Sequence, residues 1–503
     1  MVCPQILWGQ TYFNMRYPPD SGTWASGSFS IVNESSGYFV SRWSLDKLDG
    51  TWWNKIGKLD ANGNMISNTD SIHFLDKQIY VNSFKKSKGS TLYQAFTILD
   101  IGSGKHHYGM MKYDLNGKMI FHNMNTGQYQ FVVINEIQEL PDKNFIAVGT
   151  IQKSGTHPND EEVFVVKMDS LGNELWQKSL WLGGNGHNGE CIALCDDGGF
   201  IIGGAENDYT IVPKEKVKPV VVKLDGLGNI EWRKEYGSNI LSNSPAYGIL
   251  QTQDGGYVFV GGVGVRNDGV KDEKSPWIVK IDSLGDMIWN DTASTKDATI
   301  IDNKYYDILE LDDGSLIACG QRNIWNPNIV EPAKFRLHGI LSKYSRDGVH
   351  IWERRYRHPE AVDLWNTKHF LYDVEPTSDG GFVAAGWLNP STDTTQDTWV
   401  IKVDSFGCLE PGCEVIGVPE IAQTIETLKI YPNPSKGILH IEITSGIQKT
   451  KNNTYEFQLY DMLGKRVYQT KLQPYMNTIS VSDLPTGVYT YRLGTVRGMV
   501  VLE

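Results

Sequence analysis

The chain has 503 residues, of which 40% are hydrophobic and 11% aromatic, which is enough for sizeable cores and too much for global disorder. Its formal net charge of −12 argues against a nucleic-acid partner, because phosphate binding depends on clustered Lys and Arg. No apolar run approaches the roughly 18 residues that a membrane-spanning helix needs, so the sequence predicts no membrane span.

The first ten residues stand apart from the rest of the chain. MVCPQILWGQ has a short apolar core but no positively charged region ahead of it, and it is too short for a complete secretory signal. We interpret residues 1–10 as the remnant of a signal peptide that starts upstream, or as a disordered terminus.

One short sequence, most legible as VVKLDGLGNIEW at residues 221–232, recurs about seven times along the chain. Its lysines are Lys58, Lys112, Lys167, Lys223, Lys280, Lys343 and Lys402. A period of 54 to 63 residues indicates an array of supersecondary units. The repeat therefore determines the fold class before any single residue does.

Residues 245–291 illustrate what one unit contains. Four runs rich in Val, Ile and aromatic residues are separated by Gly-containing turns. Such runs predict four short strands, A to D, joined as an antiparallel meander. Units of this size stack radially, so seven copies predict an all-β, seven-bladed β-propeller over residues 11–413.

The repeated residues have structural explanations. Glycine in the A–B turn supplies positive φ, and the aspartates of both turns bond the backbone two residues on, which suits turn chemistry better than a calcium loop. The repeated Trp (176, 232, 289 and 352) is expected to pack between blades. The repeated Lys is expected to lay its stem along the blade, with its head in solvent or on a carbonyl.

The last unit has strands A (370–376), B (381–386) and C (398–404), but its fourth strand is poor. The run from Thr11 to Tyr17 resembles the D strands of other units. We therefore expect residues 11–18 to supply the closing strand of the last blade.

Six cysteines do not form a framework. Cys191 and Cys195 lie about 13 Å apart on an extended strand, beyond the roughly 7 Å limit for a disulfide. Cys408 and Cys413 flank a turn with Gly and Pro and are a disulfide candidate, which suits an oxidising, extracellular setting.

The repeat ends after Cys413. Residues 414–427 form a linker, and residues 428–503 alternate apolar and polar with turns roughly every ten residues. That pattern predicts a small, Ig-like antiparallel β-sandwich.

Three motifs of this tail carry a resemblance. They are Tyr431-Pro432-Asn433-Pro434 with Gly437, Tyr460–Lys465 with Gly464, and Leu484–Tyr489 with Gly487. In this order they resemble the C-terminal sorting domain of type IX secretion substrates in Bacteroidota, and the repeats resemble the DGG and KxDxxGxxxW propeller repeats often found ahead of it. The resemblance implies the type IX machinery as a partner and a secreted or outer cell-surface location. The terminal Val-Leu-Glu departs from relatives that end on a basic residue, which leaves processing of the tail open.

The connections between strands differ between the two faces of the expected ring. The A–B and C–D turns are short and uniform, whereas the B–C and D–A connections on the opposite, long-loop face are long and different in every blade. Variable loops on a rigid scaffold are where binding usually lies. Unrepeated aromatic residues there are our ligand-binding candidates, with packing onto the ring as the alternative: Trp181, Tyr209, Trp325, Trp365 and Trp387.

Signals for catalysis are weak. The histidines are scattered without a metal-binding spacing, so we expect no metal, no cofactor and no assigned catalytic residue. Acidic clusters at 160–162 and at Glu206 and Asp208 are interpreted as solvated loop charge. The leading hypothesis is a secreted propeller that binds a glycan or protein through its long-loop face. The alternatives are an extracellular hydrolase or lyase with its site on that face, and a purely structural surface protein.

Overall fold

The structure is a computed structural model, and the residues that it describes are 12–20, 23–46, 52–69, 77–152, 161–182, 186–208, 216–237, 243–267, 272–292, 303–325, 335–359, 368–389, 396–410, 413, 428–443, 455–461, 465–473, 475–493 and 496–503. The chain divides into two compact units, Met1–Glu414 and Val415–Glu503. Within the described ranges, no helix is long and apolar enough to cross a membrane.

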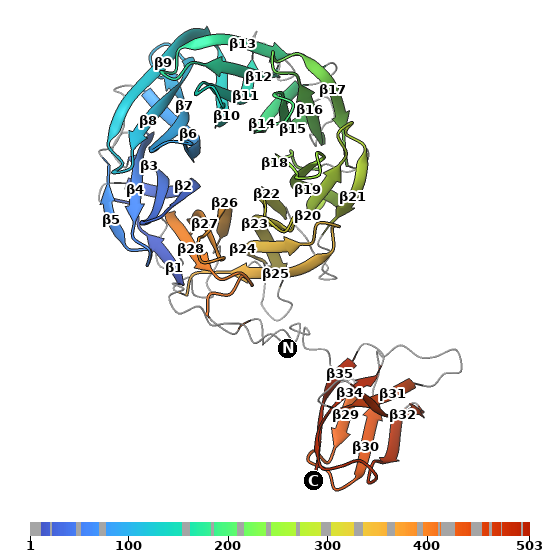
Figure 1. The fold of residues 1–503 in the computed structure, drawn as a ribbon. Coiled ribbons are helices and arrows are strands. Elements are labelled where there is room, and N and C mark those ends of the chain that lie inside the picture. The colour runs from blue at the N-terminus through green and yellow to red at the C-terminus, as the bar shows by residue number, and fades with distance from the viewer. Residues whose placement is uncertain are drawn as a thin grey trace. The chain divides into compact units, whose positions relative to one another are not determined.

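The first unit is a seven-bladed β-propeller, which confirms the predicted fold class. Seven four-stranded sheets are arranged around a centre, with one inner strand from each sheet facing it (Figure 1). Neighbouring strands of a blade pair antiparallel. In blades 1 to 7 the strands are β2 (Thr23–Glu34), β3 (Gly37–Asp46), β4 (Trp52–Leu59) and β5 (Met65–Asn68); β6 (Lys77–Lys86), β7 (Thr91–Asp100), β8 (Lys105–Asp114) and β9 (Met119–Tyr129); β10 (Phe131–Glu139), β11 (Phe145–Gln152), β12 (Glu161–Met168) and β13 (Glu174–Leu180); β14 (Gly186–Leu194), β15 (Phe200–Asp208), β16 (Lys216–Leu224) and β17 (Ile230–Glu235); β18 (Gly248–Gln251), β19 (Tyr257–Asn267), β20 (Asp272–Ile281) and β21 (Met287–Asp291); β22 (Lys304–Glu310), β23 (Leu316–Trp325), β24 (Phe335–Tyr344) and β25 (His350–Tyr356); and β26 (His369–Pro376), β27 (Phe382–Leu388) and β28 (Asp397–Val403) with β1 (Phe13–Tyr17).

The two ends of the propeller sequence meet in the seventh blade. Strand β1 pairs antiparallel with β28 and occupies the outer position that the fourth strand takes in the other blades (Figure 1). Arg16 Nε lies 2.7 Å from Asp397 Oδ2, and the Asp397 side chain is buried. The ring is therefore closed by strand pairing and by an ion pair.

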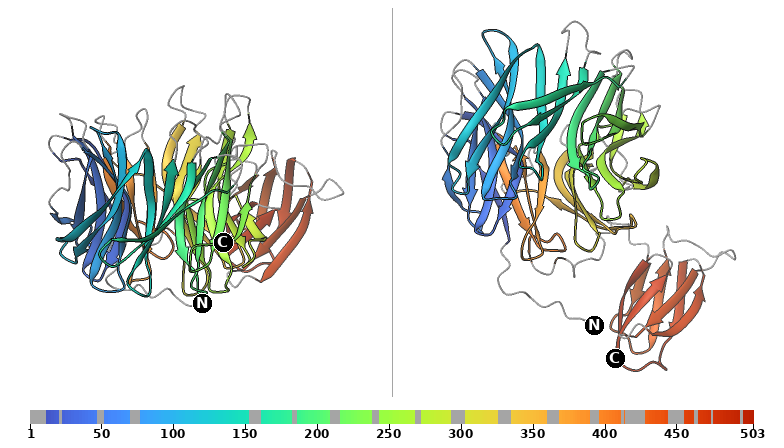
Figure 2. Two further views of the ribbon diagram at one scale, coloured as in Figure 1. Left: turned by 90° about the horizontal axis from the view of Figure 1, so that it is seen from above. Right: turned by 45° about the horizontal axis from the view of Figure 1, so that its top comes forward.

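Strands run between the two faces of the ring, so the A–B and C–D turns share one face (Figure 2). Gly255 of an A–B turn has φ +81°, and Asp254 Oδ1 accepts the N–H of Gly256. In a C–D turn, Asp225 Oδ1 accepts the N–H groups of Leu227 and Asn229. The carboxylate is used by its own turn, which confirms the turn-chemistry interpretation.

The repeated tryptophan packs between blades, as predicted. A Cβ built on Gly228, in the C–D turn of blade 4, would lie 2.8 Å from the Trp176 ring of blade 3. The same relation joins Trp232 to Gly285, Trp289 to Gly348 and Trp352 to Gly407. The Trp and Gly of the repeat are therefore two halves of one inter-blade contact.

The prediction for the repeated lysine was incomplete for several blades, because the ammonium is buried and paired with a carboxylate, even where, as for Lys223, it also donates to a carbonyl, that of Leu224 at 3.0 Å. Lys223 Nζ lies 2.7 Å from Asp197 Oδ2 and Lys402 Nζ lies 2.7 Å from Asp379 Oδ2, and both lysines are almost fully buried. Each of these aspartates belongs to the A–B turn of the same blade. A buried ammonium requires a partner, and the turn carboxylate is within reach because strand C pairs with strand B beside it. Lys58, in blade 1, donates instead to the carbonyl of Leu115.

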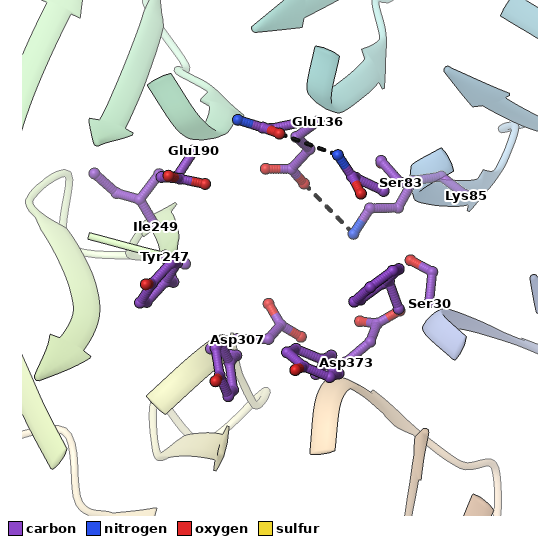
Figure 3. Close-up of a pocket in the computed structure, with 15 residues that line it drawn as sticks. Ser30, Ser83, Lys85, Glu136, Glu190, Tyr247, Ile249, Asp307 and Asp373 are labelled. Atoms are coloured by element: carbon purple, nitrogen blue, oxygen red, sulfur yellow. Dashed lines mark hydrogen bonds and ion pairs between the residues drawn. The ribbon is translucent and has the colours of Figure 1, made fainter. Parts of the chain in front are cut away.

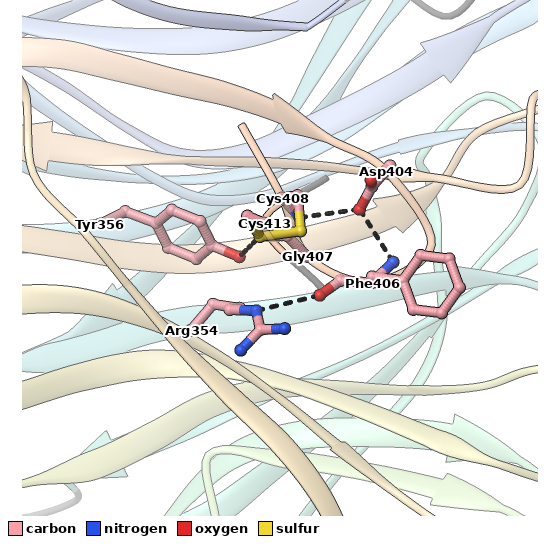
Figure 4. Close-up of a disulfide and its surroundings, with 7 residues drawn as sticks. All are labelled: Arg354, Tyr356, Asp404, Phe406, Gly407, Cys408 and Cys413. Carbon is pink, nitrogen blue, oxygen red and sulfur yellow. Dashed lines mark hydrogen bonds between the residues drawn. A yellow bond between two sulfur atoms is a disulfide. The ribbon is translucent and has the colours of Figure 1, made fainter. Parts of the chain in front are cut away.

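Cys408 and Cys413 form a disulfide in the segment that follows β28 (Figure 4). Asp404 Oδ1 accepts the Cys408 N–H at 2.7 Å, and the hydroxyl of Tyr356 donates to the Gly407 carbonyl at 2.7 Å. This segment is thus attached to blade 6 as well as to β28. Cys191, Cys195 and Cys319 are buried free thiols.

The second unit is a small β-sandwich. One sheet holds β29 (Leu428–Tyr431), β30 (Ile438–Ile443) and β33 (Tyr475–Ser480), and the other holds β31 (Tyr455–Tyr460), β32 (Arg466–Leu472), β34 (Gly487–Leu493) and β35 (Val496–Leu502). Inward side chains such as Leu439, Phe457 and Leu493 form one core.

The tail motifs lie at defined places of this unit. Asn433 Oδ1 accepts the N–H of Val501 in the last strand, and Tyr489 is buried with its hydroxyl on the Pro485 carbonyl. Tyr431 is exposed. Gly464 lies outside the described residues.

Candidate functional site

The inner strands of the seven blades line a central cavity of about 260 Å³ (Figure 3). Every blade contributes to it. The lining residues are Phe29, Ser30, Asn82, Ser83, Lys85, Asn135, Glu136, Glu190, Tyr247, Gly248, Ile249, Tyr306, Asp307, Tyr372 and Asp373.

A β-bulge determines which residues face this cavity. Six inner strands are interrupted at an equivalent point, for example between Ile134 and Glu136 in β10 and between Leu371 and Asp373 in β26. The extra residue of a bulge breaks the strict alternation of side chains between the two faces of a sheet. Two consecutive residues of one strand, such as Asn135 and Glu136, therefore both line the cavity.

One wall of the cavity is aromatic. The rings of Tyr306 and Tyr372 lie 4.4 Å apart between centroids, Tyr247 lies 5.2 Å from Tyr306, and Phe29 lies 5.0 Å from Tyr372. Phe29, Tyr306 and Tyr372 occupy the bulge position in blades 1, 6 and 7, and Tyr247 occupies the aligned position directly before β18 in blade 5. The adjacent repeats thus build one continuous arc of rings.

The aromatic arc continues toward the long-loop face. Phe29 stacks on Trp43 at 6.2 Å, near the end of β3, and Trp43 contacts Trp52 at the start of β4. In blade 7, Phe370 lies 5.9 Å from Tyr372 and 4.1 Å from Trp387. The rings therefore connect the cavity to the ends of the strands where the B–C connections begin.

Polar side chains line the cavity on both sides, including the side that carries the aromatic rings. Glu136 and Glu190 come from blades 3 and 4, and Asp307 and Asp373 face them across the cavity from blades 6 and 7 (Figure 3). Lys85 Nζ lies 3.5 Å from Glu136 Oε1. The cavity thus combines flat apolar surfaces with groups that donate and accept hydrogen bonds.

Several of these polar groups also join neighbouring blades. Asp373 Oδ2 accepts the N–H of Ile31 at 2.8 Å, and Glu136 Oε2 accepts the N–H of Ile192 at 2.8 Å. Ser30, Ser83 and Asp307 accept from the equivalent backbone N–H of the next blade in the same way. One oxygen of each carboxylate therefore has a structural role, since it pairs a buried donor.

Burial and neighbouring charges shift the pKa of several groups that line the cavity. It raises the pKa of Glu190 to about 7, against the opposing effect of Lys304. It also raises the pKa of Asp307, which is hydrogen-bonded to Asp373. Burial disfavours the Lys85 ammonium, but the surrounding carboxylates outweigh this and raise its pKa. A positive Lys85 and a Glu190 carboxyl whose pKa is about 7 make the cavity less negative than its count of acids suggests.

The two predicted loop aromatics whose side chains the structure describes do not lie in one site. Trp181 is 52% exposed and lies edge-on to His187 at 6.5 Å, whereas Trp387 is half-buried against Phe370 in a different blade. The side chain of Trp325 is not described, and Tyr209 and Trp365 lie outside the described residues. Of Trp181 and Trp387, only Trp387 is linked to the central cavity, through its contact with Phe370 and the contact of Phe370 with Tyr372.

The interpretation of the acidic clusters as solvated loop charge was wrong for Glu162 and Glu206, whereas Asp160 and the Asp208 side chain are not among the described parts of the chain. Glu162 lies in β12 and is buried, and Glu206 lies in β15 with Oε2 3.2 Å from Arg233. Both belong to strands rather than to solvated loops, because the strands extend further than the apolar runs. Among the described residues, no group of three or more His, Cys, Asp or Glu side chains is arranged to hold a metal ion.

The sequence contained a signal for the cavity that repeat alignment reveals. Aligning the inner strands places Phe29, Tyr247, Tyr306 and Tyr372 at one repeat position, with Ser, Glu or Asp directly after it in most blades. An acid within an otherwise apolar strand is the cue. The consensus of the repeat conceals it, because this position differs from blade to blade.

The C-terminal unit matches a known family, the secretion system C-terminal sorting domain, over residues 429–501. The chain is therefore a type IX secretion substrate, exported to the cell surface or the extracellular space, and its tail engages the type IX machinery. No curated protein matches the chain.

Solved structures similar to this chain are distant. They include the α-L-arabinofuranosidase Arb93A of Fusarium graminearum, at 12% identity and a TM-score of 0.39, covering 64% of this chain and 95% of that one. An ulvan lyase of family PL25 is 7% identical with a TM-score of 0.45, covering 77% and 96%. The propeller domain of the trilobed protease of Pyrococcus furiosus is 10% identical with a TM-score of 0.40, covering 75% and 93%.

Proposed function

We propose that this type IX secreted propeller binds a glycan in its central cavity, entered from the long-loop face. The observation that carries the proposal is that an arc of aromatic rings and several hydrogen-bonding side chains line the same cavity. Sugar rings have apolar C–H faces that pack on aromatic rings and hydroxyl groups that both donate and accept. A cavity that offers both rings and hydrogen-bonding groups can contact both kinds of surface on a sugar.

The geometry supports binding more than catalysis. Glu136, Asp307 and Asp373 each use an oxygen to pair the backbone of the next blade, so they are held in place by the ring. Tyr306 and Tyr372 are held as well, by their mutual contact and, for Tyr306, by a hydroxyl bond to Gln321 at 2.8 Å. Rigid aromatic anchors lose little entropy when a ligand binds.

The test is binding to a glycan array by the whole chain and by the Tyr306→Ala/Tyr372→Ala variant. Each lost stacking contact is worth about 0.5–1.5 kcal/mol, so the variant should bind its glycan roughly tenfold or more weakly. Phe406→Ala is the matched control, because Phe406 is an exposed ring in the turn that follows β28, at the position of the C–D turns on the opposite face. Equal binding by the wild type and the tyrosine variant would exclude the cavity as the site.

Glycan hydrolysis or lysis is the second candidate function. Glu190, whose pKa is raised to about 7, faces Asp307 and Asp373 across the cavity, and a general acid needs a pKa near the working pH. The Glu190→Gln variant distinguishes this function from binding. It should retain glycan binding in either case, and it should lose release of reducing ends or unsaturated products if the wild type has that activity.

A further inference from the structure

A second cavity, of about 320 Å³, lies between blades 2 and 3, outside the central cavity, which is called the channel from here on. It shares no lining residue with the central cavity. It is lined by Tyr129, Gln130, Ile151, Gln152, Phe164, Gln177 and Ser179. Its size falls at the lower end of the range of about 300–1,000 Å³ that is usual for ligand pockets.

The strands explain why this cavity forms where it does. Tyr129 ends β9, the outer strand of blade 2, and the chain crosses at Gln130 directly into β10 of blade 3. Gln152 is the last residue of β11, and Phe164 lies near the start of β12. All of these positions are at the B–C and D–A ends of the blades, so the cavity belongs to the long-loop side of the ring.

The floor and one wall of the cavity are aromatic. Phe164 and Ile151 are buried, and Tyr129 is half-buried beside them, 6.2 Å from Phe164 between ring centroids. Tyr108 packs against both rings, at 5.9 Å from Tyr129 and 5.3 Å from Phe164. This triangle of rings holds the Tyr129 wall in place.

The rim carries side-chain amides and a hydroxyl but no charge. Gln130, Gln152, Gln177 and Ser179 surround the opening. The Tyr129 hydroxyl donates to Gln177 Oε1 at 2.8 Å, which orients that amide. A planar amide offers a donor and an acceptor side by side, which matches the vicinal hydroxyls of a sugar ring. None of the described lining residues is charged, so they offer an ionic ligand no opposite charge.

We propose that this cavity is a second carbohydrate subsite, which takes one neutral sugar ring. The apolar face of the ring lies on Tyr129 over the Phe164 floor, and its hydroxyls bond Gln152 and Gln177. The subsite goes beyond the function proposed for the channel and does not depend on it. When both sites engage one polysaccharide, the second contact becomes intramolecular and raises avidity without any new surface.

The test is calorimetric titration of the whole chain with neutral hexaoses of the glucan, xylan and mannan types. The channel is first disabled with Tyr306→Ala/Tyr372→Ala, and Gln177→Ala or Tyr129→Ala is then added. We expect at least one hexaose to bind the channel-disabled chain and each added substitution to weaken it fivefold or more. Gln253→Ala, an exposed glutamine in an A–B turn on the opposite face, is the matched control and should change nothing.

Tyr129→Phe guards against misfolding, since it keeps the ring and removes only the hydroxyl. It should bind more tightly than Tyr129→Ala and more weakly than the parent. The proposal is overturned if no neutral hexaose binds the channel-disabled chain, or if binding is indifferent to Gln177→Ala and Tyr129→Phe. If wild-type and channel-disabled chains bind equally while Gln177→Ala weakens both, the channel function fails and the subsite stands.

Discussion

The indole of Trp176 lies directly against Gly228 of the following blade, where a Cβ would come within 2.8 Å of the ring. This contact explains why both residues recur with the repeat. Gly228 also has φ +77°, so its lack of a side chain meets a backbone requirement and a packing requirement at once.

Substituting this glycine should therefore cost more than backbone strain alone. Gly255→Ala provides the reference, because Gly255 has φ +81° but nothing within 4 Å of its Cβ position. We expect Gly255→Ala to lower the free energy of unfolding by about 1 kcal/mol, the cost of a left-handed Ala. Gly228→Ala should lose about 1–3 kcal/mol more, because the indole must move. Urea unfolding measures both, and equal losses would contradict the packing role.

The pair of Lys280 and Asp254 should contribute more than its exposed counterpart. Lys280 Nζ lies 2.5 Å from Asp254 Oδ1 with the lysine side chain 5% exposed, whereas Lys167 and Asp142 are 3.5 Å apart and more open to solvent. Asp254→Asn leaves a buried ammonium poorly paired and should cost about 1–3 kcal/mol, and Asp142→Asn less than about 1 kcal/mol. Thermal unfolding of the two variants at pH 7 compares them.

The same pair predicts a pH dependence. Burial opposes ionisation of Asp254, but hydrogen bonds from Lys280 and Thr252 outweigh it and lower its pKa to about 2. A lowered folded-state pKa stabilises above the unfolded value of about 3.9 and is lost as the pH falls through about 2. The loss of stability that Asp254→Asn causes relative to wild type should therefore shrink between pH 4 and pH 2. A loss that stays constant over this interval would rule out the ionised pair.

The contribution of Glu190 to stability should depend on pH in the opposite direction. Burial raises its pKa to about 7, so its contribution is fully present below the unfolded value of about 4.3 and is lost as the pH rises through about 7. Glu190→Gln should raise the melting temperature relative to wild type at pH 8 and change it little at pH 4. Glu410→Gln, at an exposed position, serves as the control and should show no such trend.

The disulfide should stabilise the end of the propeller. Cys408 and Cys413 are five residues apart, and closing so short a loop is worth about 2 kcal/mol in the chain-entropy account. The Cys408→Ser/Cys413→Ser variant should melt lower than wild type, and reductant should lower wild type to the level of the variant without affecting the variant. A further drop of the variant in reductant would point to another disulfide.

The ring and its repeated contacts follow from local sequence. Asp254 and Gly255 specify a turn, and Trp176 and Gly228 represent residues that recur at fixed spacing. Together with the alternation of apolar and polar residues in the strands, these patterns made the seven-bladed fold and the inter-blade role of the Trp predictable. The partner of Lys280 was not, because Asp254 lies in another strand pair and only the register of β19 against β20 brings the two together.

A seven-bladed ring with a secretion tail can be predicted from the sequence, because turns, strands and sorting motifs are local patterns. The position of the polar and aromatic groups of the cavity depends instead on the tertiary structure. Glu136, Glu190, Asp307 and Tyr372 come from four different repeats, and they meet because closing the ring brings every inner strand to one axis. The bulge then turns two consecutive side chains inward, against the alternation that a strand pattern predicts. The cavity is therefore a product of closure and of a local irregularity, and neither can be read from any one repeat.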